Sequence, residues 1–232
     1  MTPLYSMMEY LLYSYASILD HWGYVITVSN DGRFKTAVTY LEIAYKIENA
    51  LYQADQTKYE PLLARTEDNL GYLLFHVSPQ YNARAEKLLT SALNIRRKSL
   101  RKNRHQHLSE YAWTLNNLSE LQTCIGGKKL IEAEKNYKKA IEYRIELNDH
   151  NHGKYTHYIA WSKYGLGRCL ARLGRDDEAK ECFNEALKIY SSLSEDIESF
   201  KSDIEFVQNV DIDIEENLSL WIGNHSHFNG YC

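Results

Sequence analysis

The chain has 232 residues and a formal net charge of -4, with 44% hydrophobic and 25% charged residues. This length and apolar content suit one globular or solenoid domain, and the small negative charge implies no general attraction to nucleic acid or an anionic membrane. Three prolines and 19 tyrosines indicate long, uninterrupted helices rich in half-buried rings.

The first segment, 1–22, is apolar but has no basic start, and Glu9 and Asp20 interrupt it. It therefore predicts neither a secretion signal nor a membrane span. The four cysteines show no C-x-x-C spacing, and three of them fall within helical patterns, as small buried hydrophobes do. We expect reduced thiols and a cytoplasmic protein.

Helical patterns separated by turn signals follow one another along the chain. Gly32, Pro79, Gly126 and Gly174 mark the turns inside successive helix pairs. The first expected helix covers about 4–27, and the second follows the turn 29–32 and ends at about 53. The others cover about 59–77, 82–100, 107–124 and 130–147, with two helices across 155–192. Beyond them, 194–222 predicts short capping helices, and 223–232 predicts a flexible tail.

Five positions recur in four copies, three of which are spaced by 48 residues at every position. A small residue follows a large one, and the next helix carries an alanine, a large residue four later and a final alanine. The copies are Trp22, Gly23, Ala37, Leu41 and Ala44; Leu70, Gly71, Ala85, Leu89 and Ala92; Leu118, Ser119, Ala133, Tyr137 and Ala140; and Leu166, Gly167, Ala179, Phe183 and Ala186.

This pattern of an L-G pair, then A-x3-F, then alanine resembles the tetratricopeptide repeat. The segment Thr114 to Leu118, T-L-N-N-L, is similar to the long repeats of kinesin light chains and related bacterial proteins. The resemblance implies an all-α, right-handed α-solenoid of four helix-turn-helix repeats, at about 1–55, 56–103, 104–150 and 151–193, followed by the C-terminal cap. The period exceeds the usual 34 residues, so either the helices or the loops between repeats are longer.

The resemblance also implies a concave groove, lined by the first helix of each pair, that binds peptides. Asn69 and Asn117 match the asparagine that clamps a peptide backbone in this family, whereas Trp113 and Trp161 could instead pack between repeats. Counted from each L-G pair, the groove positions are Ser17, Asp20, His21 and Tyr24; Arg65, Asp68, Asn69 and Tyr72; Trp113, Asn116, Asn117 and Glu120; and Trp161, Tyr164, Gly165 and Arg168.

Recognised catalytic, nucleotide-binding and zinc-binding motifs are missing from the sequence. We therefore expect no enzyme activity, no cofactor and no metal. The positions that would hold a two-carboxylate chaperone tail are occupied by Asp68, Asn116 and Tyr164, a poor match to that ligand.

The expected function is a scaffold or adaptor that binds a protein or peptide, without membrane or nucleic-acid partners; self-association stays open. One alternative is a signalling-peptide sensor or a regulatory subunit of a larger protease or defence complex. Another is nucleic-acid binding through the basic run 96–104. That run also has a simpler interpretation, as the cationic end of a helix.

Overall fold

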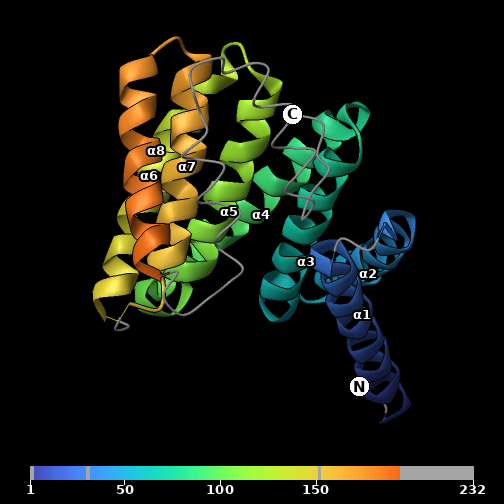
Figure 1. Ribbon diagram of the computed structural model, residues 1–232. Helices are drawn as coiled ribbons and strands as arrows, with labels where there is room; N and C mark the ends of the chain where they lie inside the picture. The colour runs from blue at the N-terminus through green and yellow to red at the C-terminus, as the bar shows by residue number, and fades with distance from the viewer. Residues whose placement is uncertain (1–2, 30–31, 151–152, 194–232) are drawn as a thin grey trace.

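The computed structural model describes residues 3–29, 32–150 and 153–193, and the regular structure in these ranges is helical (Figure 1). The segments expected to form the cap and the tail lie outside the described residues. The elements are α1 (Pro3–Ser29), α2 (Phe34–Ala54), α3 (Gln56–Val77), the short 3-10 helix η1 (Pro79–Tyr81), α4 (Asn82–Lys102), α5 (Arg104–Ile125), α6 (Lys129–His150), α7 (Thr156–Arg172) and α8 (Asp176–Leu193).

Successive helices pack as antiparallel pairs: α1 with α2, α3 with α4, α5 with α6, and α7 with α8. The pairs follow one another in chain order, with α1 and α2 at one end of the molecule and α6 to α8 at the other (Figure 1). Each second helix also packs against the first helix of the next pair. The expected all-α arrangement of stacked helix pairs is confirmed for the described residues.

The long period comes from long helices. Helices α2 to α5 have 21 or 22 residues each, and single residues, Asp55 and Asn103, join α2 to α3 and α4 to α5. Both are N-caps: the Asp55 side chain accepts a hydrogen bond from the Lys58 backbone N–H, and Asn103 accepts one from Gln106. Each capping side chain accepts a hydrogen bond from a free backbone N–H at the start of its helix, so a single residue is enough to connect the two helices.

The small residues of the repeat lie where the paired helices approach most closely. A Cβ atom built on Gly23 would lie 2.6 Å from Leu41 Cγ, one on Gly71 2.9 Å from Leu89 Cγ, and one on Gly167 2.6 Å from Phe183 Cε1. Ser119, the equivalent in the third copy, is fully buried and donates a hydrogen bond to the Leu115 carbonyl at 2.6 Å. The predicted close crossing is therefore confirmed at the three glycines, each against the predicted partner.

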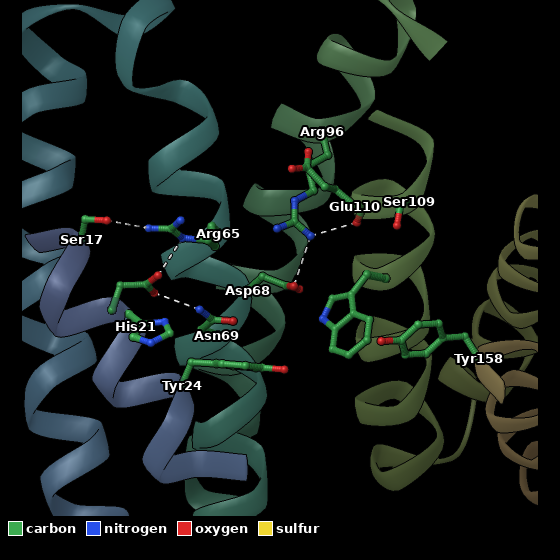
Figure 2. Close-up of a pocket in the computed structure, with 12 residues that line it drawn as sticks. Ser17, His21, Tyr24, Arg65, Asp68, Asn69, Arg96, Ser109, Glu110 and Tyr158 are labelled. Atoms are coloured by element: carbon green, nitrogen blue, oxygen red, sulfur yellow. Dashed lines mark hydrogen bonds and ion pairs between the residues drawn. The ribbon is translucent and has the colours of Figure 1, made fainter. Parts of the chain in front are cut away.

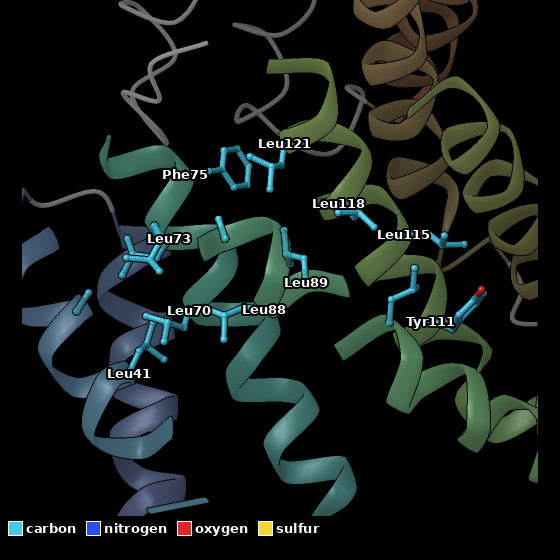
Figure 3. Packing of buried hydrophobic residues seen from close by; sticks show 14 of the residues in the cluster. Leu41, Leu70, Leu73, Phe75, Leu88, Leu89, Tyr111, Leu115, Leu118 and Leu121 are labelled. Carbon is cyan, nitrogen blue, oxygen red and sulfur yellow. The ribbon is translucent and has the colours of Figure 1, made fainter. Parts of the chain in front are cut away.

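Leucines dominate the core between the first three pairs (Figure 3). Leu70, Leu118 and Leu166, which precede the small residue, are at most 6% exposed. Trp22, predicted to occupy the same position, is 54% exposed. The difference has a simple cause, because α2, α4 and α6 cover the later copies, whereas no described helix precedes α1.

Among the described cysteines, Cys169 and Cys182 are free thiols, as expected. Cys124 is disulfide-bonded, so the expectation of reduced thiols is wrong for that residue. In the part of the chain that the structure describes, no helix combines the length and apolarity required to cross a membrane.

Candidate functional site

A cavity of about 480 Å³ opens between the first helices of the repeats (Figure 2). It is lined by side chains of α1, α3, α5 and α7, together with Arg96 of α4. Its lining residues are Ser17, Asp20, His21, Tyr24, Arg65, Asp68, Asn69, Arg96, Ser109, Glu110, Trp113 and Tyr158.

Eight of the predicted groove positions line this cavity: Ser17, Asp20, His21, Tyr24, Arg65, Asp68, Asn69 and Trp113. The other predicted groove residues lie outside it. They are Tyr72, Asn116, Asn117, Glu120, Trp161, Tyr164, Gly165 and Arg168. The resemblance thus selected the lining at the first two repeats, apart from the wrongly included Tyr72, and Trp113 of the third. It missed Arg96, Ser109, Glu110 and Tyr158.

Two buried carboxylates at equivalent positions are each held by an asparagine and an arginine. Asp20 pairs with Arg65 Nε at 2.7 Å and accepts a hydrogen bond from Asn69 Nδ2 at 2.9 Å. Arg65 and Asn69 both point from α3 toward α1 in Figure 2. One of the two N–H donors of the Asn69 amide is therefore already used by the preceding repeat, which leaves its second N–H and its amide oxygen for a peptide.

Asp68, 48 residues after Asp20, repeats this arrangement with a different source of positive charge. It accepts a hydrogen bond from Asn117 Nδ2 at 3.4 Å and pairs with Arg96 Nη1 at 3.2 Å. Burial raises the pKa of Asp68, and the neighbouring Arg96 guanidinium opposes that rise. The Oδ1 atom of Asn117 is buried without a hydrogen-bond partner. This oxygen is therefore a hydrogen-bond acceptor without a donor.

Arg96 and its equivalent Arg144 connect successive repeats. Arg96 donates to the Glu110 carbonyl at 2.9 Å and to the Thr114 hydroxyl. Arg144 donates to Asn116 Oδ1 at 3.2 Å, to the Tyr158 carbonyl at 2.6 Å and to the Ser162 hydroxyl. Sequence reasoning assigned Arg96 to a basic run and passed over Arg144. Their 48-residue spacing, applied to charged as well as apolar residues, would have identified both.

Aromatic rings form the wall of the groove at α5 and α7. The Trp113 ring centroid lies 5.3 Å from that of Trp161 and 5.6 Å from that of Tyr158. The Arg144 guanidinium lies over Trp161 at 5.2 Å and over Tyr158 at 5.4 Å. All three rings stay partly exposed. Trp113 packs against Trp161 and also lines the cavity, so it fits both interpretations, whereas Trp161 packs between repeats outside the cavity.

Charges that line the cavity are largely matched within the protein. Arg65 neutralises Asp20, and Arg96 neutralises Asp68. Burial raises the pKa of Tyr24, which also faces Asp68 and Tyr158, so its hydroxyl stays protonated at neutral pH. The cavity therefore offers rings, hydroxyls and amide groups, and its two arginines are already engaged by carboxylates.

A second polar group lies deeper between α3, α5 and α7. Glu120 Oε1 lies 3.8 Å from His76 Nε2 and 4.0 Å from Arg168 Nη1, and the ring centroids of Tyr72 and His76 are 4.4 Å apart. Burial lowers the pKa of His76 to about 3 and raises that of Glu120. The imidazole is therefore neutral at physiological pH, and Arg168 supplies the positive charge facing Glu120.

The third copy has Asn116 at the carboxylate position, and the fourth copy has neither the carboxylate nor the asparagine. Tyr164 takes the carboxylate position; it is 6% exposed, and its ring centroid lies 5.6 Å from that of Phe183. Gly165 takes the asparagine position, and a Cβ there would lie 2.6 Å from the Tyr137 ring. The larger Tyr137 thus occupies the space that Asn69 and Asn117 use in the preceding copies.

Several cations of the basic run 96–104 have partners within the protein. Arg96 is buried, Lys98 and Lys102 pair with Glu60, and Arg104 pairs with Glu146. Arg97 contacts Tyr111 and Asn94. These contacts favour the interpretation as an ordinary helix end. Arg97, Lys98, Arg101, Lys102 and Arg104 stay exposed.

Residues 112–192 match the family model of the tetratricopeptide repeat. The matched range begins in α5 and extends through α6 and α7 into α8. The match carries no information on the long-repeat subgroup. No curated protein was found that matches the chain. Within the described residues, no group of three or more histidine, cysteine, aspartate or glutamate side chains is placed to hold a metal ion.

Proposed function

We propose that this chain is a non-catalytic scaffold that binds an extended segment of a partner protein in the groove between its first helices. Tetratricopeptide repeats generally mediate protein–protein interactions, and residues 112–192 match that family. The observation that carries the proposal is the cavity of about 480 Å³, whose lining comes almost entirely from first helices.

The lining favours a ligand with apolar or aromatic side chains and little net charge. Trp113, Tyr158 and Tyr24 offer ring surface, which contributes strongly to peptide affinity. Asn69 and the hydroxyls of Ser17 and Ser109 can pair with a peptide backbone. Because Arg65 and Arg96 already pair with carboxylates, a strongly acidic tail would have to break these pairs.

A selection experiment tests the proposal without knowledge of the natural partner. The full chain is panned against a random peptide library, and the selected peptides are measured by calorimetry. We expect selected peptides to be apolar or aromatic and to lose about 10- to 30-fold in affinity with Trp113→Ala, a loss of about 1.4–2 kcal/mol.

The matched control is Ile131→Ala, which removes a residue that is 62% exposed on α6 and does not line the cavity. Its affinity should equal that of the wild type, and circular dichroism should show both variants folded. Selected peptides that bind Trp113→Ala as tightly as the wild type, or a selection that enriches nothing, would refute the proposal.

A further inference from the structure

The first helix carries most of the exposed apolar surface of the described residues. Ten of the thirteen large hydrophobic side chains that are exposed lie on α1. Leu11, Ile18 and Trp22 are each more than half exposed. A concentration of this kind on one helix marks an interaction surface rather than scattered exposure.

These side chains form a regular seam. Met8, Leu11, Tyr15, Ile18 and Trp22 are spaced by 3, 4, 3 and 4 residues, and all five are exposed. This is the spacing with which one helix presents a continuous apolar strip to another helix. We refer to these five residues as the α1 seam.

The same positions already form helix contacts inside the molecule. The residues 48 positions after Leu11, Tyr15, Ile18 and Trp22 are Tyr59, Leu63, Thr66 and Leu70, which are at most 3% exposed. They belong to α3, and α2 packs against that helix. The α1 seam thus has the position of a helix-covered face, but no described helix covers it.

We propose that the α1 seam binds the α1 seam of a second copy of this chain, so that two molecules associate through their first helices. Charge supports an identical partner. The two carboxylates of the helix turn away to α3: Glu9 pairs with Lys58 at 2.9 Å, and Asp20 pairs with Arg65 at 2.7 Å. Two seams can therefore meet without like-charge repulsion, and the seam carries no charge that would select a different partner.

The available area also suits a dimer. With roughly half of each side chain exposed, the five seam residues and their neighbours Met7 and Leu12 present about 700 Å². A stable interface of standard size takes about 800 Å² from each partner. A contact between two identical seams closes on itself about a two-fold axis and leaves no free copy of the seam.

Sedimentation equilibrium of the full chain between about 1 and 100 μM tests this proposal. We expect a dimer, and Ile18→Glu should weaken it at least 100-fold by placing two carboxylates in the apolar contact. Because Ile18 is 55% exposed, the melting temperature of the monomer should stay close to that of the wild type. Ile131→Glu, at a site on α6 that is 62% exposed, should leave the dimer intact.

A wild-type chain that stays monomeric at 100 μM would overturn the proposal, as would a dimer that survives Ile18→Glu. If the wild-type chain is monomeric and Ile18→Glu abolishes the binding of a different protein, the α1 seam binds that protein. The proposed self-association would then be wrong. Peptide binding in the groove should be unchanged by Ile18→Glu, so the two proposals fail independently.

Discussion

Arg96 and Arg144 lie 48 residues apart and make equivalent contacts in successive repeats. Each donates from Nη1 to a side chain 28 residues earlier, to a backbone carbonyl 14 residues later and to a hydroxyl 18 residues later. The acceptor is the carboxylate of Asp68 for Arg96, but the neutral amide of Asn116 for Arg144. This one difference predicts different costs for removing the two arginines.

Arg96→Met should destabilise the protein by about 3–5 kcal/mol, because it leaves the buried Asp68 without its cation. Arg144→Met should cost only about 1–3 kcal/mol, because Ser162 still donates to Asn116 at 2.7 Å. Urea denaturation of both variants measures the difference. Asp68→Asn should recover part of the loss in the Arg96→Met background. Equal costs, or no recovery, would contradict the assigned role of Asp68.

Glu48 occupies, in the first repeat, the position that Arg96 and Arg144 occupy in the next two repeats, and its side chain has the opposite charge. It is fully buried, and neither carboxylate oxygen has a hydrogen-bond partner. Burial raises the pKa of Glu48 to about 8, and the Thr66 hydroxyl opposes that rise. In this repeat the cation for Asp20 comes instead from Arg65 on α3, so an arginine at position 48 is not required.

Glu48 should make the protein less stable as pH rises. Its pKa is about 8 in the folded state and about 4.3 in the unfolded state, so the folded state holds the proton more tightly. Its stabilising effect is full below about pH 4 and is lost progressively as pH rises to about 8. Glu48→Gln should therefore raise the free energy of unfolding at pH 8.5 by a few kcal/mol relative to the wild type, with little gain at pH 4.

Denaturation curves of both proteins between pH 4 and 9 test this effect. The exposed Glu142 supplies the control, since Glu142→Gln should not change the pH profile. A gain for Glu48→Gln that is the same at pH 4 and pH 8.5 would show that the pKa of Glu48 is the same in the folded and unfolded states, and would contradict the proposed effect of burial.

The close helix crossings predict responses of different size to alanine substitution in two repeats. Gly71→Ala should destabilise by about 1–3 kcal/mol, because its Cβ would lie 2.9 Å from Leu89 Cγ and 3.2 Å from the Ala85 carbonyl oxygen. Ser119→Ala should change stability far less, because Ser119 already carries a Cβ at the equivalent position. Thermal unfolding of the pair provides the comparison, and a neutral Gly71→Ala would mean that the crossing adapts without strain.

Much of the fold could be predicted because the repeat is strict. Small residues at Gly23, Gly71 and Gly167, with a large partner on the next helix, fix each pair. The sequence could not decide between long helices and long loops. The single capping residues Asp55 and Asn103 settle that point, and side-chain caps act over three residues only.

The site was predictable only in part, because its polar residues take their partners from other repeats. Position counting placed Asn69 and Trp113 at the cavity, but gave no sign that Asn69 donates to Asp20 49 residues earlier. Arg96 looked like a surface cation beside Arg97 and Lys98, whereas its equivalence to Arg144 shows it to be a buried connection. Charged residues that recur with the same 48-residue spacing as the apolar residues are therefore expected to be buried.

Photo-cross-linking tests most directly whether the groove binds the ligand. Benzoylphenylalanine replaces Tyr24, which lines the cavity, or Ile131 on α6 as the control, and a selected peptide is irradiated with each protein. Groove binding predicts a cross-link from position 24, located by mass spectrometry, and none from position 131. Cross-linking from position 131 but not from position 24 would place the peptide elsewhere and contradict the proposed function.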